Sequence, residues 1–440
     1  MAAMLAPERS VDPHVQLFPC PVRRRYAWQL ARYGAPLSRW RRALLSGEDG
    51  TSRVRALLRV AEEETAYYPE AFLGAGVSWR DLRGIEDLAH FPTLSRATLQ
   101  ERFHELFARG VNGRDVNEGW LGKSSGSTGE PVRFFMDGES IHFFSAFLKF
   151  LWERLHLGQL PRPGSTGVVL LCTLPRSAVY ETWLPLFRGT RFRKLHRAEP
   201  DAEATLQRLS PAVITGDPDS LASLLEMDVK VKPRLILSSA FALSRELAEA
   251  LRRRTGAQVV DYYSMAETGP LGWSCEPGSG RFHTLLPAAV LEESAGEIVV
   301  TNIRNRLFPL VRYRTGDAGS IRAGTCPCGE SGTILDALSG RLASRFLTRE
   351  GVLVDPSQLQ ALLCRLGVRQ FQLIQRATGD VTLRHHGGPE PDVTEVRHAL
   401  ERLVGGAVTL LTEPCAAPIF LPGEKPLVYR SERVGCDVQP

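Results

Sequence analysis

The sequence predicts a mixed α/β protein with a large N-terminal domain and a small C-terminal one. At 440 residues the chain is too long for one ordinary hydrophobic core. Between residues 166 and 261 short apolar runs alternate with amphipathic stretches, which is typical of a sheet whose strands are joined by helices. Beyond Arg341 the pattern becomes that of a compact α+β unit. We therefore divide the chain into residues 1–340 and 341–440.

Composition excludes several classes of protein. The chain is 43% hydrophobic and 23% charged, as in ordinary soluble domains, and its net charge of +5 is too small to indicate a nucleic-acid partner. The apolar runs are too short to span a membrane, and residues 1–20 lack the apolar segment of a signal peptide. Eight cysteines in so long a chain do not indicate a disulfide scaffold. We expect a cytoplasmic protein with no membrane or nucleic-acid partner, and a homodimer stays open.

The first hundred residues indicate packing rather than chemistry. Residues Val54–Tyr68 repeat apolar side chains at helical spacing. A turn at Phe91–Ser95 precedes an expected helix at Arg96–Phe107, with Ser95 or Thr93 as its N-cap.

The middle of the chain predicts the central sheet. A strand at Val132–Met136 precedes a helix at Glu139–Leu155. That helix has an aromatic face, interpreted mainly as core and to a smaller extent as an acyl pocket, made of Phe143, Phe144, Phe147, Phe150 and Trp152. Further strands are expected at Thr166–Cys172, Ala212–Thr215, Arg234–Ser238, Gln258–Asp261 and Gly296–Asn302. Helices are expected at Glu203–Leu209, Asp219–Glu226 and Ser244–Thr255.

The C-terminal unit has its own alternation of elements. Two strands flank a turn at Glu350-Gly351, within Arg345–Val354. Later strands are expected near Phe371–Gln375, Val381–His385 and Val408–Leu411, and helices at Pro356–Leu366 and Val393–Val404.

The segment Ser124–Pro131, Ser-Ser-Gly-Ser-Thr-Gly-Glu-Pro, predicts a phosphate-binding loop. Its glycines let the backbone approach an anion closely, and its hydroxyl groups add donors. A flexible Gly/Ser linker is the plain alternative. A Walker loop is disfavoured, because Asn117 stands where that pattern needs glycine. The candidate phosphate contacts are Ser124, Ser125, Gly126, Ser127, Thr128 and Gly129.

Two later segments complete a nucleotide-binding pattern. Tyr263, after the strand at Gln258–Asp261, offers a ring that can stack on a base, and Glu267 offers a carboxylate for Mg²⁺ beside phosphates. A Thr-Gly-Asp turn then presents Asp317 to a pair of neighbouring hydroxyls, as on ribose. A further expected turn, Gly340-Arg341, carries a lone guanidinium.

Taken together and in this order, these motifs resemble those of the adenylate-forming superfamily. The run Pro-Leu-Val-Arg-Tyr-Arg-Thr-Gly-Asp and the short chain are similar to the phenylacetate-CoA ligase branch, over roughly residues 85 to 430. The resemblance implies a large N-terminal domain of α/β sheets with a small β-barrel region, followed by a mobile α+β lid. It also implies that the loop grips ATP phosphates, Tyr263 stacks on adenine, Glu267 helps bind Mg²⁺, and Asp317 and Arg341 hold the ribose.

Lys425 is the candidate adenylation lysine. Only six of the chain's basic residues are lysines, and this one lies in the Gly-bearing segment Leu421–Val428, where relatives carry a mobile Gly-Lys loop. A compact ammonium suits a crowded phosphate better than a planar guanidinium does. An exposed surface lysine is the alternative, because Glu424-Lys425-Pro426 departs from the usual sequence.

The chain also departs from the family in other motifs. Ser264 and Ala266 stand where glycine and a hydroxyl residue are usual, which implies weaker phosphate binding. Ser239-Ala240-Phe241 replaces a common glutamate. Ala343 and Ser344 replace the acidic hinge expected after Gly340-Arg341, so the usual pivot residue of the lid is missing.

Four residues suggest a structural zinc site: Cys275, His283, Cys326 and Cys328. Three thiolates and one imidazole fit tetrahedral zinc with no open position. The Cys-x-Cys spacing is tight, so spacing alone leaves unligated thiols open. Relatives in the resembled branch often carry these residue types in these places, which favours zinc.

The predicted activity is ATP-dependent activation of a carboxylic acid to an acyl-adenylate, with transfer to a thiol, most simply coenzyme A. The alternatives are an amide synthetase or a carrier-protein loader in a biosynthetic pathway, and, in another class, a catalytically silent nucleotide- or acyl-binding homologue. The sequence does not identify the acid, although the aromatic face of the helix at 139–155 favours an aromatic one.

Overall fold

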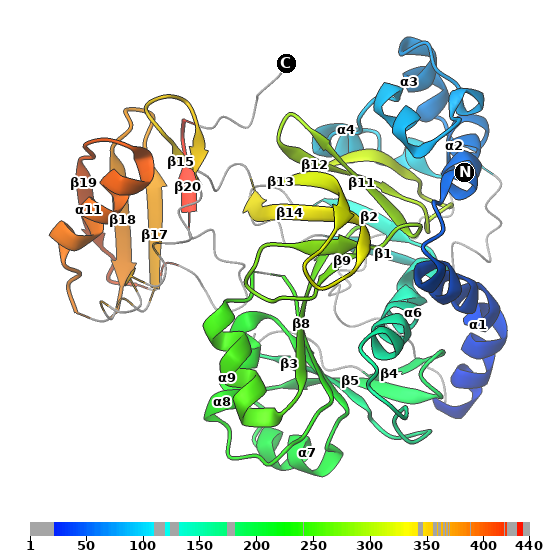
Figure 1. Ribbon diagram of the computed structural model, residues 1–440, viewed down its shortest axis with the longest axis horizontal. Coiled ribbons are helices and arrows are strands. Elements are labelled where there is room, and N and C mark those ends of the chain that lie inside the picture. Colours follow the sequence, from blue (N-terminus) through cyan, green and yellow to red (C-terminus); the bar gives the residue numbers. More distant parts are fainter. Residues whose placement is uncertain are drawn as a thin grey trace. The chain divides into compact units, whose positions relative to one another are not determined.

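A computed structural model gives the arrangement of most of the chain (Figure 1). It describes residues 22–109, 119–123, 132–173, 181–240, 242–341, 346–354, 370–387, 389–417 and 429–433, with residues 359, 362, 363, 366, 368 and 419. In this part of the chain no helix is both long enough and apolar enough to cross a membrane.

The chain forms two compact units. The larger unit contains the described residues up to 338, except 316–318, which group with residues 339–440 in the smaller unit. The break after Leu338 falls close to the boundary expected at 340/341. The roles assigned to the two domains stay predictions.

The N-terminal part of the larger unit consists of helices: α1 (Val22–Ser46), α2 (Thr51–Glu64), α3 (Tyr68–Gly74), η1 (Trp79–Asp81), η2 (Ile85–His90), α4 (Arg96–Glu101) and η3 (Phe103–Leu106). Two expected helices are therefore broken in two. The first ends at Thr65, whose hydroxyl donates to the Ala61 carbonyl and accepts the Tyr68 N–H. The second begins as expected, because the Ser95 hydroxyl accepts the Thr98 N–H at 3.0 Å.

One large sheet dominates the larger unit. Its described strands are hydrogen-bonded in the order β11-β12-β13-β14-β10-β9-β8-β7-β6-β3-β5-β4. Their bounds are β3 (Val168–Cys172), β4 (Glu181–Leu184), β5 (Thr190–His196), β6 (Val213–Gly216), β7 (Leu235–Ser238), β8 (Gln258–Met265), β9 (Gly269–Ser274), β10 (Phe282–Thr284), β11 (Ala289–Ser294), β12 (Glu297–Asn302), β13 (Leu310–Thr325) and β14 (Ser331–Arg341). The mixed α/β class is confirmed. Hydrogen bonding does not separate the predicted small barrel from this sheet, since the antiparallel strands β9–β14 continue it.

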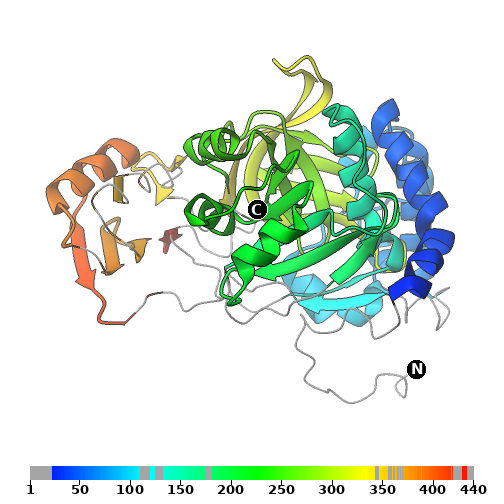
Figure 2. The same ribbon diagram turned by 90° about the horizontal axis from the view of Figure 1, so that it is seen from below.

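The parallel strands β5, β3, β6, β7 and β8 are buried on both faces. Neighbouring residues of one strand enter different cores: Val168 and Leu235 lie in one, Val169 and Ile236 in the other. Helices α7 (Ala202–Leu209), α8 (Pro218–Glu226) and α9 (Arg245–Thr255) cover one face, and α6 (Gly138–Arg154) covers the other with α1 packed behind it (Figure 2). This sandwiching explains why the three central strands β3, β6 and β7 are mostly apolar.

A separate hairpin consists of β1 (Trp120–Lys123) and β2 (Arg133–Met136), paired antiparallel with Lys123 opposite Arg133. The side chains of the hairpin pack partly against each other, with the rings of Trp120 and Phe134 5.2 Å apart. The predicted phosphate loop lies between these two strands in the sequence.

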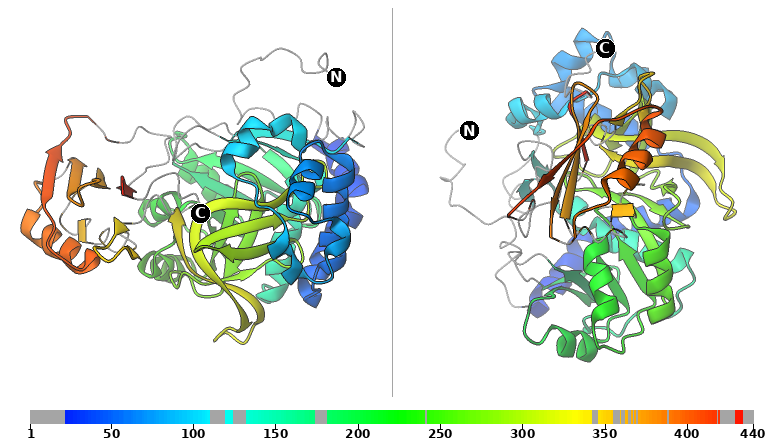
Figure 3. Two further views of the ribbon diagram at one scale, coloured as in Figure 1. Left: turned by 90° about the horizontal axis from the view of Figure 1, so that it is seen from above. Right: turned by 90° about the vertical axis from the view of Figure 1, so that its left-hand side faces the viewer.

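The smaller unit is a four-stranded sheet with a helix against it, ordered β19-β18-β17-β20 (Figure 3). Its elements are β15 (Phe346–Leu347), β16 (Leu353–Val354), β17 (Gln370–Gln375), β18 (Val381–His386), α11 (Val393–Val404), β19 (Leu410–Pro414) and β20 (Tyr429–Ser431). The Gln375 side chain joins the β15–β16 hairpin to the sheet through two 2.8 Å hydrogen bonds to the Leu347 backbone. The helix expected at 356–366 lies mostly outside the described residues.

Candidate active site

The carboxyl ends of the parallel strands are where an open α/β sheet binds its ligands. At this edge Ser238 of β7 lies opposite Asp261 of β8. Burial raises the pKa of the Asp261 carboxyl to about 7, and its Oδ2 accepts the Leu243 N–H at 3.3 Å. Sequence reasoning missed Asp261, although a lone acid at the end of an apolar strand is a visible signal.

Strand β8 continues further than the sequence indicates. Residues 262–265 were expected to follow the strand, but they pair with β9, and a bulge interrupts the register between Tyr263 and Ser264. The Tyr263 ring is 8% exposed and lies 6.4 Å from the Phe282 ring. The structure thus places the candidate adenine-stacking residue on a strand, where its backbone is fixed by pairing on one side.

Glu267 lies in the tight turn that joins β8 to β9. Only 4% of the residue is exposed, and one carboxylate oxygen accepts a hydrogen bond from the Tyr313 hydroxyl at 3.0 Å. Tyr313 is the middle residue of the Arg-Tyr-Arg motif, for which the sequence suggested no separate role. A buried carboxylate oriented by a phenol is a candidate oxygen ligand for a cation.

Asp317 lies inside the long strand β13. We expected a Thr-Gly-Asp turn that follows a strand. That prediction is wrong, because β13 continues through these residues to Thr325. Gly316 has a φ of +77°, a left-handed conformation that interrupts the regular pleat within the strand. Asp317 is half-buried directly after this irregularity.

The other predicted nucleotide contacts are only partly described. Gly340-Arg341 was expected to form a turn, but the two residues end strand β14, and the Arg341 side chain lies outside the described atoms. Also outside the described residues are Ser124, Ser125, Gly126, Ser127, Thr128, Gly129, Ala343, Ser344 and Lys425.

The aromatic face of α6 is mostly core, as expected. Phe143, Phe147, Phe150 and Trp152 are buried. Phe144 is half-buried, and its ring lies 6.3 Å from the Tyr262 ring, beside the strand that carries Tyr263.

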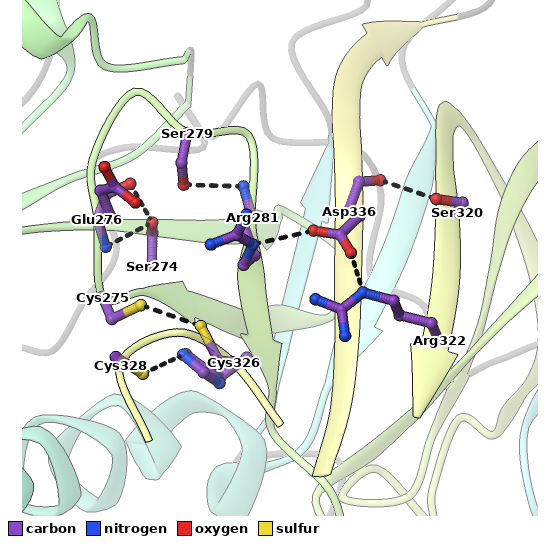
Figure 4. Close-up of polar contacts among 11 residues, drawn as sticks. Ser274, Cys275, Glu276, Ser279, Arg281, Ser320, Arg322, Cys326, Cys328 and Asp336 are labelled. Atoms are coloured by element: carbon purple, nitrogen blue, oxygen red, sulfur yellow. Dashed lines mark hydrogen bonds and ion pairs between the residues drawn. The ribbon is translucent and has the colours of Figure 1, made fainter. Parts of the chain in front are cut away.

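Cys275, His283, Cys326 and Cys328 come together in one cluster. Figure 4 shows its three cysteines side by side. Their candidate ligand atoms all lie within 4.8 Å of one another. The Cys275 and Cys326 sulfurs are 3.7 Å apart, too far for a disulfide, and Cys328 Sγ lies 3.4 Å from His283 Nε2. A tetrahedral zinc site with bonds of 2.0–2.3 Å has edges of roughly 3.5–3.8 Å. The 3.7 Å sulfur–sulfur separation falls within this range, and the 3.4 Å sulfur–nitrogen separation lies just below it.

The surroundings of the cluster support a metal-binding imidazole. Burial, with the nearby Arg154 and Arg281 charges, lowers the pKa of His283 to about 4, so its ring is neutral at pH 7. Arg281 is oriented by Asp336, with Nε 3.2 Å from Oδ1 (Figure 4). The residues present therefore fit a closed, structural zinc site.

A surface cavity of about 850 Å³ lies elsewhere. Lys232, Arg234, Arg254 and Gln258 are among its lining residues. They precede or begin β7 and β8, so the cavity is at the amino ends of these strands. It is therefore separate from the edge that carries Asp261, Tyr263 and Glu267.

Comparison with known proteins agrees with the motifs. Residues 124–304 match the family model described as AMP-binding enzyme. The chain is 25% identical to the phenylacetate-coenzyme A ligase of Thermus thermophilus over 357 residues, which is 74% of this chain and 77% of that protein. It is 24% identical to the enzyme of the same name from Escherichia coli, over 70% of this chain and 74% of that one.

The fold agrees as well. The crystal structure of 2-hydroxyisobutyryl-CoA ligase in the postadenylation state superposes with a TM-score of 0.64 at 16% identity, covering 88% of this chain and 90% of that one. An open conformation of the same ligase gives 0.57. The match to the AMP-binding model and the similarity to the curated relatives support the assignment that the motifs indicate, to the adenylate-forming superfamily and its phenylacetate-CoA ligase-like branch.

Proposed function

We propose that this enzyme is an AMP-forming acid–thiol ligase that joins a carboxylic acid to coenzyme A. The observation that carries the proposal is the match of residues 124–304 to the AMP-binding model, together with Tyr263 and Glu267 at the carboxyl edge of the sheet. The related phenylacetate-coenzyme A ligases support coenzyme A as the acceptor.

The reaction has two balanced steps. A carboxylate oxygen of the acid attacks the α-phosphorus of ATP, and the bond to the β-phosphate oxygen breaks, giving acyl-adenylate and pyrophosphate. The thiolate of coenzyme A then attacks the acyl carbon, and AMP leaves with the former carboxylate oxygen. The protein contributes mostly positioning and charge neutralisation to the first step.

The nucleotide contacts follow from the motifs. The Tyr263 ring stacks on adenine, Asp317 and Arg341 hold the ribose hydroxyls, and residues 124–129 donate to the phosphates. Glu267 suits Mg²⁺, because its carboxylate is buried and already held at one oxygen by Tyr313. When bound, Mg²⁺ neutralises phosphate charge. Glu267 would supply an oxygen ligand for it, oriented by the hydrogen bond from the Tyr313 hydroxyl.

The identities of the carboxylic acid and of the acyl acceptor remain to be assigned. The half-buried Phe144 beside Tyr262 favours an aromatic acid. The silent homologue rests on the altered motifs of the sequence, and an amine or a carrier-protein thiol as acceptor stays an alternative from the sequence analysis. A cytoplasmic location and a homodimer rest on the sequence analysis alone.

Pyrophosphate release tests the function. We expect at least one acid from a panel of aryl, arylacetic and aliphatic acids to release pyrophosphate with ATP and Mg²⁺, and the product to have the mass of its coenzyme A thioester. Parallel reactions with amines or a pantetheine-bearing carrier protein identify a different acceptor. Nucleotide binding without pyrophosphate release for any acid would indicate the silent homologue.

A zinc ion bound by Cys275, His283, Cys326 and Cys328 would be structural, since all four tetrahedral positions come from the protein. Protein purified without chelator should contain about one zinc per chain. Cys326→Ser should lose this zinc and unfold at a lower denaturant concentration, because structural zinc contributes directly to the folding free energy. Metal analysis and urea unfolding measure both effects.

Cys415→Ser is the matched control for the zinc test. Cys415 is a free cysteine of the smaller unit, and it should keep the zinc when replaced. Wild-type protein that contains no zinc, or a Cys326→Ser variant that keeps it, would refute the site.

The role of Lys425 in adenylation stays a proposal from the sequence. Lys425→Ala should slow acyl-adenylate formation by roughly 10²–10³-fold, the scale for losing one preorganised charge contact. Thioester formation from supplied acyl-adenylate should be almost unchanged, because relatives use a different lid orientation for that step. Separate assays of the two half-reactions measure this. Lys232→Ala is the surface control, and equal slowing of both steps, or of neither, would exclude Lys425 from this role.

A further inference from the structure

Arg304 is a buried cation for which the motifs give no role. It lies between β12 and β13 and is only 3% exposed. Removing a guanidinium from water is unfavourable unless its donors are paired, so its contacts need an explanation. No element of the nucleotide-binding pattern in the sequence includes this residue.

The guanidinium of Arg304 donates to three acceptors. Nε lies 3.0 Å from Asn302 Oδ1, Nη1 lies 2.9 Å from the Pro270 carbonyl oxygen, and Nη2 lies 2.6 Å from the Thr268 carbonyl oxygen. The charge also lies over the Phe143 ring, 4.2 Å from its centroid. Burial lowers the pKa of Arg304 to about 9, opposed by the Asp137 carboxylate, so the side chain remains charged at neutral pH.

The Thr268 carbonyl belongs to the turn that carries Glu267, and the Pro270 carbonyl lies at the start of β9, the strand that follows the turn. They stand on either side of Gly269, whose φ of +74° places it in the left-handed region. The rigid fork of a guanidinium spans both carbonyls at once, whereas a lysine ammonium cannot reproduce that planar pair of bonds. Arg304 therefore fixes the backbone of the turn, while Tyr313 fixes the Glu267 carboxylate at 3.0 Å.

We infer that Arg304 is a positioning residue that holds the Glu267 turn in the conformation that engages Mg²⁺ and ATP. This inference rests on the proposed function, because Glu267 is the Mg²⁺ ligand in it. Arg304 acts through the turn and does not itself contact the nucleotide. Its loss should therefore weaken the Mg²⁺-dependent part of nucleotide binding and leave the acid site alone.

Binding of α,β-methylene ATP tests the inference without turnover. Calorimetry with and without Mg²⁺ gives the gain in affinity that Mg²⁺ produces. In Arg304→Lys we expect this gain to fall about tenfold, the equivalent of losing roughly one charged hydrogen bond. The affinity without Mg²⁺ and the KM of the acid should change less than about twofold. Amide hydrogen exchange across residues 266–270 should become faster.

Two further variants complete the test. Arg234→Lys is the matched control, because Arg234 donates to the Leu157 and Gln159 carbonyls at the opposite edge of the sheet and should leave the Mg²⁺ gain unchanged. Asn302→Ser removes one hydrogen-bond partner of Arg304 and keeps the guanidinium charge, so it should also reduce the affinity gain that Mg²⁺ produces. This variant replaces Arg304→Lys as the test if Arg304→Lys does not fold.

The possible results separate the two hypotheses. A folded Arg304→Lys with the wild-type Mg²⁺ gain would overturn the positioning role, as would an unfolded Arg304→Lys with an unchanged gain in Asn302→Ser. A wild-type protein whose nucleotide affinity does not respond to Mg²⁺ would instead contradict the proposed role of Glu267.

Discussion

Burial of the parallel strands on both faces is the constraint on which the rest of the structure depends. Helices α7–α9 and α6 cover the two faces, so β3, β6 and β7 must be apolar along their length. Polar side chains that could contact a ligand are therefore found near the carboxyl ends of the strands and in the segments that follow them. Asp261 is the last residue of β8 that pairs with the parallel strand β7, Tyr263 lies further along β8, and Glu267 follows the strand.

The same constraint explains why the site depends on distant segments. The turn that carries Glu267 consists of the few residues between Met265, the end of β8, and Gly269, the start of β9. Tyr313 on β13 and Arg304 before it add hydrogen bonds that span 34 to 46 positions of the sequence. The Arg-Tyr-Arg motif therefore has a role of its own besides preceding Asp317. Its central residue, Tyr313, donates a hydrogen bond that orients the Glu267 carboxylate.

Much of this could be predicted from the sequence where the signal is local. The strands at 168–172 and 235–238, the helix at 393–404 and the cap at Ser95 follow from periodicity and capping residues. The errors lie where a strand continues beyond the point that local signals indicate. Residues 262–265 extend β8 by pairing with the next strand, β9, and residues 315–317 lie inside β13. Arg304 could not be recognised, because its carbonyl acceptors lie 34 and 36 positions earlier in the chain.

The sequence predicted which four residues could bind the metal, but not how their ligand atoms are arranged. The sequence suggested four ligands but left unligated thiols open, and it is the structure that brings all four ligand atoms within 4.8 Å of one another. The cluster lies among β9, β10 and the segment between β13 and β14, and it would link strands of the antiparallel part of the sheet.

The central claim is that the acid is activated as an acyl-adenylate, and oxygen transfer tests it most directly. An accepted acid labelled with ¹⁸O in its carboxylate should yield AMP that carries one ¹⁸O atom, because the attacking oxygen stays with AMP when the thiol displaces it. Mass spectrometry of the nucleotide products measures this label. Unlabelled AMP, or ADP with the label in inorganic phosphate, would contradict the account.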